Sequence, residues 1–168
     1  MTFYTQIKVL LRLSFVICFF ILLFIYLDLV QDLKFYLYVI LPLILIFVAP
    51  VLIIHINYYL ESRKVSYEIY EEKIYIIVND KKLTYHIGEI KEIIFYMTAN
   101  KLKDSASSNF LYDYYYYAKI IFFSNDETIV TCLHSDNIDQ ILRDNLNDVD
   151  IVKIKTFYPI IPLRRRGS

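Results

Sequence analysis

Two apolar runs near the start of the chain set its architecture: Val9–Leu27, VLLRLSFVICFFILLFIYL, and Phe35–Ile54, FYLYVILPLILIFVAPVLII. Only Arg12 and Ser14 interrupt the first run, and the second contains no charged residue. A helix of about 20 apolar residues is long enough to cross a hydrocarbon core of about 30 Å. Neither run has the regular polar stripe of a helix on the surface of a soluble protein. The two runs therefore predict a transmembrane helical hairpin.

The hairpin is expected to occupy residues 1–62, with spans at about 9–27 and 35–56 and a short polar connection between them. Pro42 and Pro50 lie inside the second span. Proline removes a backbone donor, and a membrane helix tolerates this by a local adjustment. We therefore expect a kink at each proline rather than the end of the helix.

Basic residues flank the hairpin on both outer sides. Lys8 and Arg12 lie at the start of the first span, and Arg63 and Lys64 follow the second. Because Lys and Arg are enriched on the cytoplasmic side of membrane proteins, both termini are expected in the cytoplasm. His55 would then lie at the inner interface, where a histidine at the end of a helix needs no function.

A second basic group, Arg164, Arg165 and Arg166, lies in a predicted basic tail, residues 159–168. Together with Arg63 and Lys64, these residues are candidates for contact with the membrane surface. Anionic lipids attract each nearby Lys or Arg by about 1 kcal/mol. Such a contact would help to dock the protein on the lipid bilayer and implies no specific ligand.

Composition argues against several classes of function. The formal net charge is zero, whereas a nucleic-acid-binding surface must be basic. The chain has two glycines, Gly88 and Gly167, too few for a Gly-rich phosphate-binding loop. Cys18 falls in a span and Cys132 in a predicted strand, so we expect no disulfide between them.

Catalytic motifs are also missing from the sequence. His86 and His134 have no cysteine or serine partner at a recognised spacing, and Asp136 and Asp139 are expected to face solvent from a helix. We therefore expect no enzyme activity, cofactor, metal ion, nucleic acid or small-molecule substrate.

After the hairpin, apolar residues alternate with polar ones, the period of a β-strand. We expect six strands, which begin near residues 65, 74, 83, 93, 113 and 128. The polar stretch Ala99–Asn109, with Lys101 and Lys103, is predicted to be a mobile solvated loop. Ser135 is a good N-cap for an amphipathic helix that reaches about Asn147. The apolar stripe of this helix consists of Ile138, Ile141, Leu142 and Leu146. One more strand is expected within Val149–Phe157.

Three segments carry a resemblance to a known family: Ser66–Tyr75 (SYEIYEEKIY), Gly88–Ile93 (GEIKEI) and Lys119–Glu127 (KIIFFSNDE). With the hairpin before them and the helix after them, they resemble the bacterial pleckstrin-homology-like (PH-like) two-span membrane proteins. The resemblance implies a membrane α-hairpin followed by an α+β or all-β, partly open PH-like barrel. Six to seven antiparallel strands capped by one helix would form that barrel, over residues 63–158. It also implies the inner, cytoplasmic membrane of a bacterium.

The first hairpin turn departs from the lipid-binding members of that family. Those members carry basic residues at this turn, whereas this chain has Glu71, Glu72 and Lys73. Acidic groups repel the phosphates of phosphoinositide headgroups. Phosphoinositide binding is therefore not carried over to this chain.

The most unusual local feature is a run of four aromatic residues, Tyr114, Tyr115, Tyr116 and Tyr117, in the predicted strand 113–123. Successive side chains of a strand point to opposite faces, so two tyrosines would lie on each face. One pair would fill the core, and the other would either pack under the loop or helix or form an exposed patch. Because tyrosine is enriched at interfaces, the run is our candidate partner-binding site.

The resulting hypothesis is a membrane-anchored binding or scaffolding module that contacts a protein or another copy of itself. One alternative is an accessory or immunity-type subunit of a larger membrane system. Another is a transport component, which would need polar groups inside its spans. The spans offer only Ser14 and Cys18, so we rank transport below the others.

Overall fold

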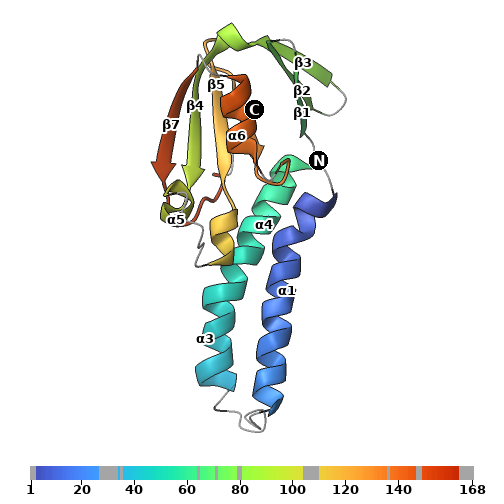
Figure 1. The fold of residues 1–168 in the computed structure, drawn as a ribbon, viewed down its shortest axis with the longest axis vertical. Coiled ribbons are helices and arrows are strands. Elements are labelled where there is room, and N and C mark those ends of the chain that lie inside the picture. Colours follow the sequence, from blue (N-terminus) through green and yellow to red (C-terminus); the bar gives the residue numbers. More distant parts are fainter. Residues whose placement is uncertain are drawn as a thin grey trace, which may run out of the picture.

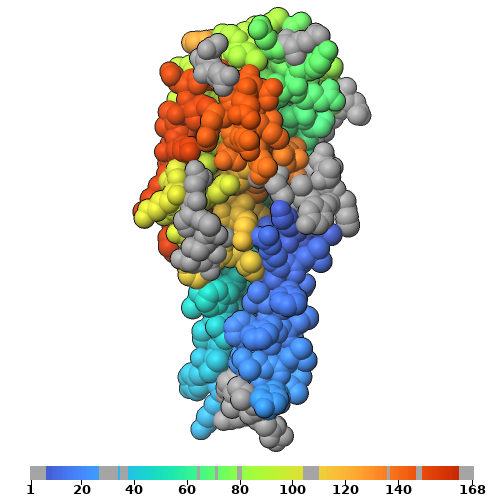
Figure 2. Space-filling view, in the orientation of Figure 1, coloured from blue at the N-terminus to red at the C-terminus, as the bar shows by residue number. Residues whose placement is uncertain are grey.

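The computed structural model of the 168-residue chain describes residues 3–26, 34, 36–63, 65–70, 72–78, 81–103, 110–135, 137–146 and 149–162. A long helical hairpin forms one end of the molecule, and two β-sheets with short helices form the other (Figure 1). In the space-filling view the hairpin is a narrow stalk beneath a wider domain (Figure 2).

The hairpin consists of one continuous helix and one segmented helix. The continuous helix is α1 (Phe3–Tyr26). The segments are the π-helix η2 (Tyr36–Ile40), α3 (Leu41–Leu43), the π-helix η3 (Ile44–Val48) and α4 (Ala49–Ser62). Pro42 and Pro50 each lie at the start of an α-helical segment that follows a π-helical one. Because proline cannot donate a backbone hydrogen bond, it favours such a change of hydrogen bonding. The sequence predicts a kink at each proline; what the structure describes before each of them is a π-helical segment.

Two helices of the described chain are long and apolar enough to cross a membrane, over Ile7–Tyr26 and Tyr38–Ser62. Their side chains are mostly exposed, and the exposed ones include large apolar groups such as Phe15, Leu22 and Leu45. Continuous apolar surface of this kind is rare on soluble monomers. The two helices are therefore candidate membrane spans.

The first sheet is antiparallel and follows the hairpin directly. Its strands are β1 (Val65–Tyr70), β2 (Lys73–Val78) and β3 (Lys81–His86), in the order β1-β2-β3. Tyr67 lies opposite Ile76, which in turn lies opposite Leu83, so these three share one face. This face looks toward the rest of the domain.

The second sheet has the order β6-β5-β4-β7. Its strands are β4 (Ile90–Met97), β5 (Tyr117–Phe122), β6 (Glu127–Thr131) and β7 (Asp150–Lys155). Six strands precede the helix α6 (Ile138–Asn145), as predicted, and β7 is the expected seventh. The prediction of antiparallel strands throughout is wrong for β7, which runs parallel to β4. The helix between β6 and β7 provides the crossover that a parallel strand requires. Among the described residues no ladder joins the two sheets, so the barrel is not closed.

Short helices occupy the remaining connections. They are the 3-10 helix η4 (Ile87–Glu89), α5 (Ala99–Leu102) and the 3-10 helix η5 (Leu111–Tyr114). The predicted loop 99–109 therefore begins as a helix, capped by the hydroxyl of Thr98, which accepts a bond from Lys101 N at 3.5 Å. The rest of that loop lies outside the described residues. The helix predicted from Ser135 has Asn137 as its N-cap, and Ile141 in its expected apolar stripe is 40% exposed.

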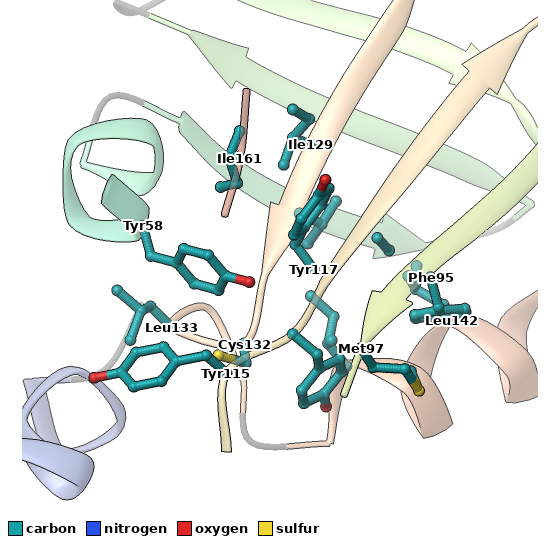
Figure 3. Close-up of a cluster of buried hydrophobic side chains, with 14 of the residues drawn as sticks. Tyr58, Phe95, Met97, Tyr115, Tyr117, Ile129, Cys132, Leu133, Leu142 and Ile161 are labelled. Atoms are coloured by element: carbon teal, nitrogen blue, oxygen red, sulfur yellow. The ribbon is translucent and has the colours of Figure 1, made fainter. Parts of the chain in front are cut away.

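The second sheet lies between two layers that cover its opposite faces. On one face, Leu142 of α6 packs close to Phe95 of β4 (Figure 3). On the other face, Tyr58 of α4 lies beside Tyr117 of β5, with their ring centroids 6.1 Å apart. The C-terminal part of α4, just after the predicted second span 35–56, is therefore part of the core of the domain.

Candidate functional site

The tyrosine run does not form the predicted exposed patch. Tyr115, Tyr116 and Tyr117 are buried, and only Tyr114, at 39% exposure, reaches the surface. The predicted strand 113–123 is wrong at its start, because η5 ends at Tyr114 and β5 begins only at Tyr117. Without the alternation of a strand, no pair of these tyrosines is directed outward.

Each buried tyrosine has its own partners. The Tyr115 hydroxyl lies 2.9 Å from Nδ1 of His55, and the Tyr117 ring stacks on Tyr96 with centroids 4.7 Å apart. The Tyr116 hydroxyl donates to Oδ1 of Asp139 at 2.7 Å. Burial, and then the charge of Asp139, raise the pKa of Tyr116, and burial raises the pKa of Tyr117 to about 12. These tyrosines are neutral at physiological pH and hold the core together.

One face of α4 is buried, and hydrogen bonds near its C-terminal end fix the helix to the domain. Val51, Ile54 and Tyr58, three or four residues apart on one face, are completely buried. The Tyr58 hydroxyl donates to the Pro159 carbonyl at 2.7 Å, and Oγ of Ser62 lies 2.6 Å from Oγ1 of Thr131. The helix and the domain therefore share one core.

The start of the predicted basic tail lies against α4. Asn57 donates from Nδ2 to the Ile161 carbonyl at 3.1 Å and accepts from the Ile161 N–H at 2.9 Å. Pro159 and Ile161 are buried. Residues 159–162 thus form part of the interface between the helix and the domain.

The predicted membrane-contact residues are only partly covered by the structure. Arg63 is exposed at the C-terminal end of α4, where its N–H donates to the Tyr59 carbonyl at 3.0 Å. Lys64, Arg164, Arg165 and Arg166 lie outside the described residues.

His134 has a structural position. Its Nε2 lies 3.1 Å from the Val65 carbonyl, and its Nδ1 accepts from the Thr131 N–H at 3.4 Å. This arrangement suits a neutral ring, and burial lowers the pKa of His134. His134 therefore ties the start of β1 to the end of β6. His86 is exposed, and Asp136 lies outside the described residues.

A cleft of about 840 Å³ opens beside the end of α4, between the first sheet and the β5–β6 hairpin. Its apolar wall is the inner face of the first sheet, and these side chains are Val65, Tyr67, Ile76, Val78, Leu83 and Tyr85. Tyr85 stacks on Phe122 with ring centroids 3.9 Å apart, and this pair forms part of the lining. Leu83 is 46% exposed, so the apolar face is only partly covered.

The lining of the cleft also includes charged groups. They are the carboxylates of Glu61, Asp126 and Glu127 and the guanidinium of Arg63. Glu127 forms an ion pair with Lys119, and Asp126 accepts a bond from the Ser124 hydroxyl at 2.9 Å. The described lining has no histidine, cysteine or serine. The cleft therefore combines an apolar wall with charged groups.

Side chains hold the two sheets together next to the cleft. The Tyr67 hydroxyl donates to the Ile129 carbonyl at 2.6 Å and lies 2.9 Å from Oγ1 of Thr128. These bonds bridge β1 and β6, which share no backbone ladder.

Sequence reasoning missed this cleft because its walls come from four separate parts of the chain. The available signal was the alternation of apolar residues in three successive strands, since an apolar sheet face requires a cover. The helix α6 has eight residues and already covers the second sheet. Among the described residues, no group of three or more His, Cys, Asp or Glu could hold a metal ion.

Comparison with known proteins gives one positive result. Searches of curated proteins and of solved structures found no match. A family model described as a PH domain matches residues 1–137. The match covers most of the chain and includes both long helices, so this chain belongs to the PH domain family.

Proposed function

We propose that this chain is a membrane-anchored binding or scaffolding module of a bacterial inner membrane. In this proposal the hairpin crosses the bilayer, both termini lie in the cytoplasm, and the PH-like domain acts through protein–protein contact without catalysis. Membership of the PH domain family supports a binding module. The two exposed apolar helices support the anchor.

One observation carries the proposal: α4 is shared between the apolar hairpin and the domain. Ile53 on this helix is 57% exposed, whereas the next residue, Ile54, is completely buried. Tyr58, four residues after Ile54 on the same helix, packs against Tyr117 of the domain. A helix that presents one face to its surroundings and another to the core holds the domain in a fixed orientation. A scaffold at a membrane surface requires such an orientation.

The proposed contact surface is the cleft and not the tyrosine run. The cleft is open and lined by both apolar and charged groups, as recognition sites usually are. The tyrosines at 115–117 are buried and unavailable without unfolding.

A photo-crosslinking amino acid at Leu83, inside the cleft, tests this assignment. The matched control is the same group at Tyr70, which is 65% exposed on the first strand and does not line the cleft. In native membranes we expect a discrete protein adduct from position 83 and none from position 70. Equal labelling at the two positions would remove the cleft as the contact surface.

Topology has a separate test. A cysteine introduced at Gln31, between the spans, should react with an impermeant thiol reagent in intact cells. The control is a cysteine at Ser107 in the domain, which should react only after the cells are opened. The opposite pattern would reverse the proposed orientation.

An accessory or immunity-type subunit is the second candidate, and the exposed apolar surface of the stalk favours it, because partner helices could pack there. Co-purification in mild detergent would distinguish the two. A stoichiometric foreign membrane protein favours the accessory role, and self-association favours the scaffold. Transport has less support, because the Ser14 hydroxyl already donates to the Leu11 carbonyl in its own helix at 2.9 Å.

A further inference from the structure

A row of aromatic rings lies where the domain meets the stalk. Phe47 of η3 stacks on Phe110 at 5.9 Å between centroids, and Phe110 stacks on Tyr112 at 5.1 Å. Tyr112 in turn contacts Phe157 at 6.4 Å and Tyr158 at 5.0 Å. We call these five residues the aromatic row. Phe157, at 74% exposure, is its most open member.

The aromatic row lies at the end of the domain that faces the stalk. Phe157 comes two residues after the end of β7, and in Figure 1 β7 ends beside α5 at the lower edge of the domain. The exposed Ile160 follows in the same segment. The row therefore continues the apolar surface of the stalk onto the base of the domain.

The length of the second helix places this row relative to a bilayer. The run Phe35–Ile54 contains no charged residue, and a helix of about 20 such residues matches the hydrocarbon core, which puts one boundary near His55. Phe47 precedes His55 by about 12 Å along the helix, on the bilayer side of that boundary. Because Phe110 stacks on Phe47, it lies at the same depth.

The first helix also places the base of the domain on the bilayer side of the boundary. Arg12 lies over the ring of Tyr114, 4.4 Å from its centroid, at the level of the domain base. Beyond Arg12, α1 continues to Tyr26, a rise of about 21 Å, roughly 9 Å less than a hydrocarbon core. The described part of α1 beyond the domain base is therefore shorter than the hydrocarbon core.

The polar groups at the base suit an interfacial position. Lys103 follows α5 and is exposed, and a long basic side chain of this kind can extend to the headgroups. Lys101 instead lies over the ring of Tyr116, with its Nζ 4.6 Å from the centroid. The one carboxylate of η5, Asp113, is buried and accepts bonds from Asn100 Nδ2 at 2.9 Å and from the Phe110 N–H at 3.1 Å. Its charge is thus compensated within the protein.

We propose that the base of the domain inserts into the membrane interface, with Phe157 and Ile160 among the headgroups and upper acyl chains. This inference rests on the proposed membrane anchor and adds a second attachment to it. Interfacial segments bury their apolar side chains about 5–10 Å into the boundary region. An insertion of that depth agrees with the difference of roughly 9 Å between the described length of α1 beyond Arg12 and the thickness of the hydrocarbon core.

Single-tryptophan variants of the full chain test the inference, because the chain has no tryptophan of its own. The variants are Phe157→Trp in the aromatic row, Phe19→Trp in the stalk and Phe123→Trp at the far end of the domain. All three phenylalanines are more than half exposed, so the larger ring fits. Each variant is reconstituted in phosphatidylcholine vesicles, with or without bromine on the acyl chains as a quencher.

We expect the Phe157→Trp emission to be blue-shifted and quenched, more strongly by bromine near the headgroup than by bromine deep in the chain. Phe19→Trp should be quenched by deep bromine, and Phe123→Trp by neither. Quenching of Phe19→Trp without quenching of Phe157→Trp would overturn the inference and leave the anchor intact. Absence of quenching in both would overturn the anchor as well. A blue-shifted Phe157→Trp that ignores bromine and changes with protein-to-lipid ratio would mean a protein contact, and would also overturn the inference.

Discussion

Ile54→Ala should destabilise the domain although Ile54 belongs to a predicted membrane span. Ile54 is completely buried in the core that α4 shares with the second sheet. Replacing a buried isoleucine by alanine removes three side-chain carbons and leaves a cavity, which costs about 2–5 kcal/mol. For a chain of this size, each kcal/mol changes Tm by about 2–4 °C. The expected loss is therefore about 4–20 °C.

Ile53→Ala is the matched control. Ile53 is the same residue type on the same helix, but its side chain is 57% exposed. A surface substitution of this kind changes stability by less than about 0.5 kcal/mol. Thermal unfolding of both variants in mild detergent can be followed by near-ultraviolet circular dichroism, because the chain has 17 tyrosines and the core contains several of them. Most of the tyrosines that are buried in the described structure belong to the domain, so the signal mainly reports the packing of the domain.

An equal loss of Tm in both variants would show that burial of the Ile54 side chain against the rest of the protein does not contribute to stability. An unchanged Tm in Ile54→Ala would show that the helix leaves the domain in detergent. Either result would refute the shared core, and with it the argument for a fixed orientation.

Three further predictions concern other contacts. Leu142→Ala should lower the free energy of unfolding by about 2–5 kcal/mol, because Leu142 is on the buried face of α6. Ile141→Ala on the same helix should cost less than about 1 kcal/mol, because Ile141 is 40% exposed. Chemical denaturation measures both. Asn57→Ala removes two hydrogen bonds to Ile161. We expect the free energy of unfolding to fall by about 1–3 kcal/mol and the chain to be cleaved faster by proteases after residue 158. Cleavage at the wild-type rate would contradict the docking of residues 159–162 on α4. The stability of the wild type should fall as the pH drops below about 6.5, because burial lowers the pKa of His134 and the unfolded chain then binds more protons than the folded one. His134→Gln should flatten that dependence in denaturation experiments at pH 5 to 7, and an unaltered slope would assign it to other groups.

The sequence was sufficient for the order of elements but not for their packing. The alternation of apolar residues from Val65 onward correctly predicted the three strands of the first sheet, because a strand that covers a core on one face must alternate. The parallel pairing of β7 with β4 could not be predicted from its own residues. Parallel and antiparallel strands share the same period, and only the crossover through α6 decides between them.

The tyrosine run shows a different limit. Four consecutive large residues fit a strand in composition, yet Tyr114, Tyr115 and Tyr116 all precede β5. Asp113 accounts for the difference, since its carboxylate accepts the Phe110 N–H and so caps η5. Such a local hydrogen bond outweighs the strand propensity of the tyrosines. The sequence alone does not show which N–H group the Asp113 carboxylate binds.

The second apolar run shows why the boundary between span and domain was beyond the sequence. A side chain that faces lipid and one that faces a protein core both need to be apolar, so Ile53 and Ile54 carry the same signal in opposite environments. The distinguishing information lies in polar residues that appear only toward the end of the helix. Asn57 and Ser62 form bonds to Ile161 and Thr131, and such groups would be costly in lipid. Their positions show that α4 enters the domain about two turns before it ends. A hydropathy window averages over those turns, and it therefore assigns to the membrane residues that the domain needs for its core.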